Sequence, residues 1–375
     1  MEKMVFTRDE TEFMRRAIEL ADRGRFGVHP NPRVGAVVVR GGEIIGEGYH
    51  ARFGGPHAEV EALRAAGEGA RGAEIYVTLE PCRHYGKTPP CTKALIEAGV
   101  ARVTFGARDP HVEVSGGGAE ELRAARIDVR TGLLAAECER LIRTFTKRVR
   151  LGMPWVTLKS AMTLDGKVAT HSGASRWITS KDSRRIVHEK RAQVDAILTG
   201  LGTVLADDPM LNVRLEGERD LRSPHRIVLD PEGRLPSDCR MVQSAGRQRT
   251  TLVISNRLPK DRRKRFVEQG LDLLPLPCRA NVFDWEDLLR WCGGRPMNEV
   301  LIEAGPNLVG GAFDARIVDS VMVFIAPKVI GGEKAPGVVG GLGVETMEQA
   351  ARLVNVTIQP AGPDFLYEAD VEYPE

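Results

Sequence analysis

The chain has 375 residues, of which 42% are hydrophobic and 28% charged, and its formal net charge at pH 7 is +2. These values are typical of a soluble globular protein of two or three domains, and they indicate no nucleic-acid-binding surface. The N-terminus is charged early and no apolar stretch is long enough to cross a bilayer, so we expect neither a signal peptide nor a membrane partner. Six thinly spread cysteines are no disulfide framework, which favours a cytoplasmic location.

The first part of the chain alternates short apolar runs with amphipathic segments. Gly41-Gly42 predicts a hairpin turn, Pro56 suits the start of a helix, and Gly99 suits the end of one. In chain order, we predict a helix at 11–23, strands at 34–39 and 43–49, a helix at 57–66, a strand at 74–79, a helix at 91–98, a strand at 101–106 and a helix at 133–149. This alternation predicts an α/β layered sheet with helices on both faces.

A break follows at Gly152-Met153-Pro154, after which strands and helices alternate again. We therefore predict two domains, 1–150 and 151–375. The strands predicted in the second domain are 155–160, 196–199, 226–229, 251–255, 300–303 and 320–325.

His57-Ala58-Glu59, Glu80-Pro81-Cys82 and Cys91 form the most informative pattern in the chain. Zinc binds imidazole and thiolate ligands tetrahedrally, and three protein ligands leave one position open for water, as in catalytic sites. We therefore predict that His57, Cys82 and Cys91 bind zinc. Glu59 is expected to carry protons between water and a leaving amine, so the pattern predicts a hydrolytic deaminase.

The ligand spacing departs from the H-x-E and P-C-x-x-C signature of zinc deaminases, because residues 83–90 separate Cys82 from Cys91. A loop of this length can still fold back through Gly86 and the two prolines. It argues against assuming a nucleoside or nucleic-acid substrate. A structural zinc site with His84 as a fourth ligand, or buried cysteines without metal, remain alternatives.

Several segments resemble the bifunctional deaminase-reductase family of riboflavin biosynthesis, and the likeness covers nearly the whole chain. They are HPNPRVGAVVV (29–39), GEGYHARFGGPHAEVEAL (46–63), VTLEPCRHYGKTPPC (77–91), LKSAMTLDGKVAT with SGASRWITS (158–180), TGLGTVLADDPMLNVR (199–214) and IEAGPNLVGGAF (302–313). The resemblance implies an N-terminal cytidine-deaminase-like three-layer α/β/α domain. It also implies a C-terminal dihydrofolate-reductase-like α/β domain.

The same resemblance implies two consecutive reactions on small phosphoribosyl pyrimidines, carried out by a homo-oligomer. The first is zinc-dependent deamination of 2,5-diamino-6-(5-phosphoribosylamino)pyrimidin-4-one, and the second is reduction of its ribosyl group to a ribityl group by NADPH. The residues that would contact the deaminase substrate are Asn31, His50, His84 and Lys87. Lys87 offers a cation to the 5′-phosphate, whereas His50 and His84 could instead bond only to loop backbone.

In the second domain, the segment 305–311 follows an apolar strand and opens a helix, an arrangement that suits an anion. It is neither a G-x-G-x-x-G fingerprint nor a P-loop, and taken alone it is more often only a tight strand-to-helix turn. By resemblance, the residues that would contact NADPH are Ala161, Trp177, Thr203, Asp207, Gly305, Pro306, Asn307, Leu308, Val309, Gly310 and Gly311. Those that would contact the ribosyl substrate are Lys159, Ser175, Arg191, Leu211, Arg214 and Glu303.

Two of these residues, Arg191 and Arg214, are expected to bind phosphate through their guanidinium forks. The pair Asp165-Gly166 is typical of a turn, which favours a structural role for Asp165 over a role as proton donor. Two other functions stay open: a deaminase of a free base, nucleoside or tRNA, and a zinc-stabilised binding protein without activity. An aromatic content of 5% disfavours nucleic acid as the substrate.

Overall fold

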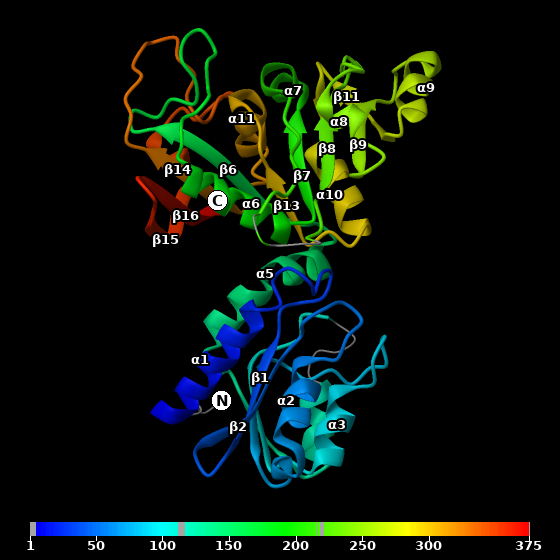
Figure 1. Cartoon of the computed structure of the whole chain (residues 1–375), viewed down its shortest axis with the longest axis vertical. Helices are drawn as coiled ribbons and strands as arrows, with labels where there is room; N and C mark the ends of the chain where they lie inside the picture. The colour runs from blue at the N-terminus through cyan, green and yellow to red at the C-terminus, as the bar shows by residue number, and fades with distance from the viewer. Residues whose placement is uncertain (1–4, 112–116, 216, 218–220, 375) are drawn as a thin grey trace. The chain divides into compact units, whose positions relative to one another are not determined.

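A computed structural model of the chain describes residues 5–111, 117–215, 217 and 221–374. The chain divides into two compact units, Met1–Gly152 (unit 1) and Met153–Glu375 (unit 2), each built around its own sheet (Figure 1). None of the helices within the described residues is long and apolar enough to span a membrane.

Unit 1 is a mixed sheet between two layers of helices. Its elements are α1 (Arg8–Asp22), β1 (Gly35–Arg40), β2 (Glu43–Tyr49), α2 (Ala58–Ala66), the 3-10 helix η1 (Gly67–Ala70), β3 (Glu74–Leu79), α3 (Cys91–Ala98), β4 (Arg102–Ala107), α4 (Gly117–Ala124), β5 (Asp128–Thr131) and α5 (Ala135–Leu151). The strand order is β2-β1-β3-β4-β5; β1 is antiparallel to both neighbours, whereas β3, β4 and β5 are parallel. α1 packs with α5, and α2 packs with α3, so the two groups form separate layers.

The elements of unit 1 begin and end where local chemistry directs them. A capping box starts α1, because Thr7 Oγ1 accepts a hydrogen bond from Glu10 N while the Glu10 carboxylate accepts one from Thr7 N. Gly99 ends α3 in the left-handed conformation, with φ of 68°. The strands β1 and β3 are almost fully buried, since helices cover both faces of the sheet. The predicted elements of this half are confirmed, with ends shifted by up to three residues. The helix α4 and the four-residue strand β5 were not predicted.

Unit 2 is built on a nine-stranded sheet with the order β10-β9-β8-β7-β13-β6-β14-β16-β15. Its elements are β6 (Trp155–Thr163), α6 (Lys181–Gln193), β7 (Ala196–Gly200), α7 (Leu201–Asp207), β8 (His225–Leu229), α8 (Arg240–Gln243), β9 (Thr250–Ser255), α9 (Lys260–Glu268), β10 (Asp272–Leu276), β11 (Cys278–Arg279), β12 (Val282–Phe283), α10 (Trp285–Gly294), β13 (Glu299–Ile302), α11 (Pro306–Asp314), β14 (Ser320–Ala326), η2 (Met347–Gln349), β15 (Arg352–Ala361) and β16 (Asp364–Glu372). The strands predicted here are confirmed, but β10, β11, β12, β15 and β16 were not predicted.

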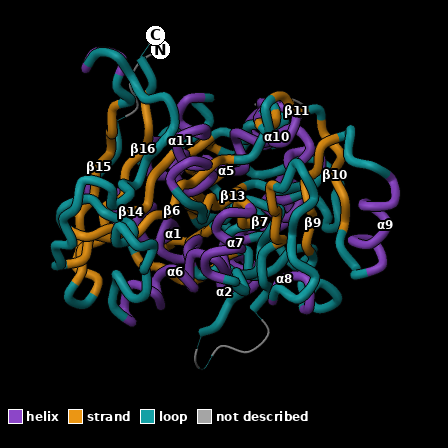
Figure 2. Tube along the Cα trace, turned by 90° about the horizontal axis from the view of Figure 1, so that it is seen from above, coloured by secondary structure: helices purple, strands orange, loops and turns teal. Residues whose placement is uncertain are grey.

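In the order of the sheet, the seven strands β10, β9, β8, β7, β13, β6 and β14 are parallel, so their carboxyl ends meet at one edge of the sheet. Figure 2 shows the strands following one another across the view in the order of the sheet. The chain runs outward from β7 to β10 and then returns, placing β13 between β7 and β6. A ligand site is expected beyond the carboxyl ends of strands at such a reversal.

Candidate active sites

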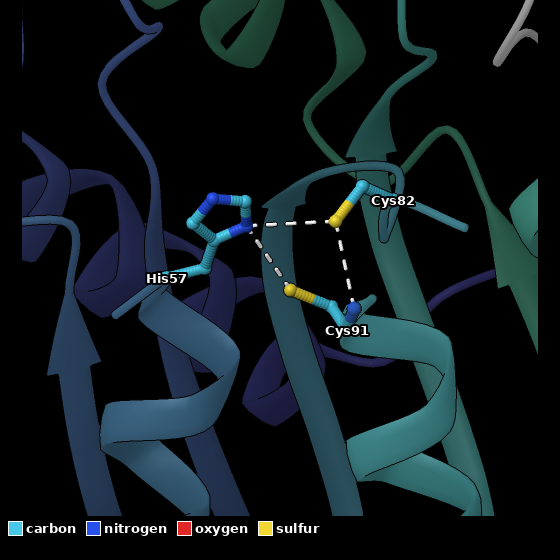
Figure 3. A group of neighbouring side chains, drawn as sticks. All are labelled: His57, Cys82 and Cys91. Atoms are coloured by element: carbon cyan, nitrogen blue, oxygen red, sulfur yellow. Dashed lines mark hydrogen bonds between the residues drawn. The ribbon is translucent and has the colours of Figure 1, made fainter. Parts of the chain in front are cut away.

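His57, Cys82 and Cys91 come together at one end of unit 1 (Figure 3). His57 is the N-cap of α2, Cys82 lies in the loop after β3, and Cys91 is the first residue of α3. We expected His57 inside the first turn of its helix, but its extended backbone places it just before that turn. The ends of two helices and one strand thus hold the three side chains.

The three ligand atoms fit a zinc ion. They all lie within 4.8 Å of one another, and Nδ1 of His57 is 3.2 Å from Cys91 Sγ and 3.5 Å from Cys82 Sγ. Tetrahedral zinc, with bonds of about 2.0 Å to nitrogen and 2.3 Å to sulfur, puts such atoms about 3.5 Å apart. His84 is not part of this group among the described residues, so a closed site with His84 as fourth ligand gains no support.

The protonation of this cluster suits a metal. A hydrogen bond from the Cys91 thiol lowers the pKa of Cys82 to about 4, and the backbone N–H of Cys91 also points at Cys82 Sγ, 3.5 Å away. Sharing that proton with Cys82, together with burial, raises the pKa of Cys91. One thiolate is therefore ready, and the proton of the second thiol would be released when a cation binds.

Glu59 is buried in the first turn of α2 and lines the same cavity as His57 and Cys82, two of the predicted metal ligands. Burial raises the pKa of its carboxyl group, while the neighbouring His57 opposes this shift. A carboxyl group whose pKa is raised toward neutrality can both accept and donate a proton near physiological pH.

The cavity has a volume of about 1000 Å³, which is larger than a free pyrimidine base needs. All four residues predicted to contact the deaminase substrate line it: Asn31, His50, His84 and Lys87. The ammonium group of Lys87 lies 4.0 Å from the centroid of the Phe53 ring, which is another residue of the cavity wall.

The two ring nitrogens of His50 are both engaged within the protein. Nδ1 lies 2.9 Å from the carbonyl oxygen of Pro56, which can only accept, so Nδ1 carries the ring proton. Nε2 is then an acceptor, and Asn31 Nδ2 donates to it over 3.1 Å. Burial lowers the pKa of His50, which keeps the ring neutral. His50 therefore orients Asn31.

In unit 2, the predicted cofactor residues gather at the carboxyl ends of β6, β7 and β13. No side chain caps the start of α11 at Gly305, so N–H groups of its first turn are left for an anion. Thr203 Oγ1, from α7, accepts a hydrogen bond from Gly305 N over 3.1 Å. Gly310 faces elsewhere: a Cβ there would lie 2.2 Å from the backbone carbon of Gly340. This glycine serves the packing of the 340–341 segment on α11.

The predicted substrate residues of unit 2 include a buried ion pair. Nε and Nη2 of Arg191 donate to the two carboxylate oxygens of Glu303 over 2.7 and 2.8 Å, and Nη1 donates to Asn212 O over 3.2 Å. The guanidinium fork that we expected to bind phosphate is thus directed at Glu303. Lys159 is buried nearby, which lowers its pKa, and the negative charge of Glu303 opposes that shift.

The 170–178 segment forms hydrogen bonds with residues that follow two different strands of the sheet: Asp207 after β7 and Lys328 after β14. Ser175 Oγ donates to Asp207 Oδ1 over 3.3 Å, and Arg176 donates to the carbonyl oxygen of Asp207. On the other side, Lys328 Nζ donates to Trp177 O over 2.7 Å. The exposed Trp177 ring lies under the guanidinium group of Arg184, 4.4 Å from its centroid.

Asp165 is a turn residue, as the sequence favoured. Its carboxylate accepts hydrogen bonds from the Thr163 hydroxyl (2.6 Å), Gly331 N (2.7 Å) and Ile330 N (3.2 Å). The hydrogen bond from Thr163 is the main cause that lowers the pKa of Asp165 to about 2, and the two backbone N–H groups add to it. Asp165 therefore has no proton to donate near neutral pH.

Two residues near these sites were missed from the sequence. Thr88 Oγ1 lies 3.3 Å from Nε2 of His57, and the T-P-P-C motif that contains it was a usable signal. Nδ1 of His188 accepts a hydrogen bond from Arg214 N over 3.2 Å, and burial lowers its pKa to about 4. No sequence pattern indicated this second contact, because it joins α6 to a loop 26 residues away.

Comparison with known proteins gives the same division. Residues 7–107 match the family described as "Cytidine and deoxycytidylate deaminase zinc-binding region", and residues 154–367 match "RibD C-terminal domain". The cytidine-deaminase-like fold predicted for the N-terminal domain is thereby confirmed.

Similar proteins cover almost the whole chain. The riboflavin biosynthesis protein RibD of Escherichia coli K12 is 46% identical over 362 residues, which are 94% of this chain and 96% of that protein. A solved structure of Acinetobacter baumannii RibD is 35% identical, with a TM-score of 0.86 over 97% of this chain and 99% of that one. A diaminohydroxyphosphoribosylaminopyrimidine deaminase/5-amino-6-(5-phosphoribosylamino)uracil reductase from Thermotoga maritima is 38% identical, with a TM-score of 0.82 over the same shares. With both halves matched in order along nearly its full length, the chain belongs to the RibD family of riboflavin biosynthesis proteins.

Proposed function

We propose that the chain is a bifunctional enzyme of riboflavin biosynthesis with one active site in each unit. The first site deaminates 2,5-diamino-6-(5-phosphoribosylamino)pyrimidin-4-one by hydrolysis, and the second reduces the ribosyl group of the product to a ribityl group with NADPH. The observation that carries this proposal is the convergence of His57, Cys82 and Cys91 in a large cavity that Glu59 also lines.

At the deaminase site, His57, Cys82 and Cys91 would hold a zinc ion, which when bound would supply a Lewis acid that makes water nucleophilic near neutral pH. Glu59 takes a proton from the attacking water as a C–O bond forms at the ring carbon that bears the 2-amino group. Glu59 then gives that proton to the departing nitrogen. The C–N bond breaks and ammonia leaves, and the proton of the new hydroxyl group passes to the adjacent ring nitrogen as the ring carbon becomes a carbonyl. One proton of the water thus ends on ammonia and the other on the ring.

Residues around the cavity select the substrate. The amide N–H of Asn31 donates to His50, so its side-chain oxygen is left to accept a hydrogen bond from an N–H of the aminopyrimidine. Lys87 binds the 5′-phosphate as a point charge, and His84 supplies a further polar contact in the same loop. The volume of about 1000 Å³ supports a substrate that carries a ribose phosphate.

At the reductase site, bound NADPH supplies the hydride. The uncapped start of α11 (residues 305–308) would bind a phosphate group of the cofactor, and Ala161, Trp177, Thr203 and Asp207 would also contact it. Lys159, Ser175, Leu211 and Glu303 contact the ribosyl substrate, with Arg191 holding the carboxylate of Glu303. Arg214 binds the phosphate, on a loop fixed by Arg191 and His188.

We further propose that the enzyme is a cytoplasmic homo-oligomer. Its described cysteines are all free thiols, which suits a reducing compartment. The edge strand β15 exposes Val356 and Ile358, and the neighbouring β16 exposes Phe365, an apolar edge that a second copy could cover.

The test is to incubate the purified zinc-loaded chain with the diaminopyrimidine substrate and NADPH, and to follow ammonia and NADPH absorbance together. We expect ammonia to appear first and NADPH oxidation to follow in equal amount. If no ammonia forms, the deaminase assignment is wrong. If ammonia forms but NADPH is not oxidised, the reductase assignment is wrong.

A further inference from the structure

We propose that Thr88 is a positioning residue of the metal centre: its hydroxyl accepts the Nε2 proton of His57 and so fixes Nδ1 as the metal-binding nitrogen. This inference rests on the proposed zinc site. It assigns to the loop between the two cysteine ligands a role that ligand spacing alone does not reveal.

The geometry of the His57 ring carries the argument. Nδ1 points between the two sulfurs, at 3.2 and 3.5 Å, and Figure 3 shows the second ring nitrogen turned away from them. An imidazole that offers the Nδ1 lone pair to a cation must carry its proton on Nε2. Thr88 Oγ1 lies 3.3 Å from Nε2, so the hydroxyl oxygen is the acceptor of that proton. The hydroxyl keeps its own proton for a partner in the cavity, which Thr88 also lines.

The backbone around Thr88 is well suited to hold this hydroxyl in place. Gly86 N donates to Thr88 O over 3.2 Å, a backbone hydrogen bond across the bend at residues 86–88. Pro89 and Pro90 follow and restrict the backbone, and Pro90 is the N-cap that leads directly into Cys91. One short segment therefore carries both a metal ligand and the outer partner of another metal ligand.

This arrangement gives the long ligand spacing a chemical use. A P-C-x-x-C loop has only two residues between its cysteines, whereas residues 83–90 separate Cys82 from Cys91 here. The longer loop has room to return across the His57 ring and place Thr88 against Nε2. Lys87, the proposed phosphate ligand, is the preceding residue, so substrate binding and metal geometry share one loop.

Outer hydrogen-bond partners of metal-binding histidines fix the tautomer and ring orientation, and their loss usually weakens metal binding about 10- to 100-fold. The test compares Thr88→Val, which removes the hydroxyl at nearly constant shape, with Thr88→Ser, which keeps it. Tyr85→Phe is the matched control, because it removes an exposed hydroxyl from the same loop. Zinc affinity of the full chain is measured by competition with a chromophoric chelator at fixed pH.

We expect Thr88→Val to bind zinc about 10- to 100-fold more weakly than the unsubstituted chain, and Thr88→Ser and Tyr85→Phe to bind it within about 3-fold. Thermal unfolding of the full chain, followed by circular dichroism, checks that unit 1 of each variant is folded. Unchanged zinc affinity in Thr88→Val, or equal loss in Thr88→Ser, would overturn the role of Thr88 while leaving the deaminase proposal intact. If the unsubstituted chain binds no zinc, the deaminase proposal itself fails, and this inference with it.

Discussion

Glu59 combines two properties that a proton carrier needs. It lines the cavity that would hold the substrate, and burial raises the pKa of its carboxyl group. A carboxylate at an exposed position would be too weak a base near neutral pH to take a proton from water at a useful rate.

Glu59→Gln keeps the size and burial of this side chain but removes its ability to carry a proton. We expect the variant to retain zinc and to release ammonia about 10²- to 10⁴-fold more slowly. Ammonia assays measure the rate, and metal analysis of the same sample serves as the control. Deamination at the unsubstituted rate would reject the role of Glu59 in proton transfer.

His225 is a buried imidazole at the first residue of β8, at the opposite end of that strand from the carboxyl edge of the sheet. Nε2 lies 2.8 Å from Thr251 Oγ1, and the ring packs edge-on against Trp291 at a centroid distance of 6.0 Å. Burial, with the positive charge of Arg249 next in size, lowers the pKa of His225 to about 4. Its pKa in the unfolded chain is about 6.5, so the unfolded state binds more protons between these values.

The free energy of unfolding should therefore rise with pH through this window. The contribution of His225 is complete above pH ~6.5 and is lost progressively as the pH falls toward 4, by up to about 2 kcal/mol between pH 7 and pH 5. Urea unfolding of unit 2, followed in the full chain at both pH values, measures this loss. His225→Gln should lose correspondingly less stability between the two pH values; equal losses in both proteins would show that His225 is not the responsible group.

At the scale of elements, α11 and the 340–341 segment touch backbone to backbone. Gly340 N donates to Pro306 O over 3.0 Å, and a Cβ on Gly310 would meet Gly340 atoms at 2.2 and 2.3 Å. Contacts this short force backbone to move, whereas a Cβ on the adjacent Gly311 would meet nothing within 4 Å. Close packing therefore requires a glycine at position 310, whereas position 311 has room for a side chain.

Gly310→Ala should destabilise unit 2 by about 1–3 kcal/mol and weaken NADPH binding, because the start of α11 must shift. Gly311→Ala, the matched control, should stabilise the helix by about 0.5–1 kcal/mol, since alanine loses less backbone entropy there. Thermal unfolding and NADPH titration measure both effects. If Gly310→Ala unfolds at the same temperature as Gly311→Ala, the packing argument is wrong.

At the scale of the whole molecule, the metal cluster and the proposed cofactor site belong to different units, each with its own core. The chemistry of one unit should therefore not require the ligand of the other. The two reactions are linked only because the product of the first is the substrate of the second.

A zinc chelator should abolish ammonia release and spare NADPH oxidation when the deaminated intermediate is supplied. Readdition of zinc should restore ammonia release, and circular dichroism shows whether the chain stays folded throughout. Loss of both activities in a chain that remains folded would contradict two independent sites.

Local sequence predicted most of the elements and the three side chains that the structure brings together, His57, Cys82 and Cys91, because periodicity, caps and ligand spacing act over a few residues. The helix α3 (Cys91–Ala98) and the strands β1, β3 and β7 were predicted to within one residue at each end. The hairpin of β15 and β16 was missed, since β15 is an edge strand, exposed on both faces and interrupted by a bulge between Val354 and Thr357. An exposed strand carries no alternation of apolar and polar residues to read.

The sequence by itself determined which side chains could bind zinc, in which order, and that two α/β units follow one another. Only the tertiary structure decided which partners other site residues contact. Both ring nitrogens of His50 bond within the protein, to Asn31 and Pro56. Arg191 bonds to Glu303, and Gly310 packs against Gly340. Asn31 and His50 are 19 residues apart, and Arg191 and Glu303 are 112 apart. Hydrogen-bond partners at such separations are chosen by the packing of the sheet and its loops, and no local pattern records that choice.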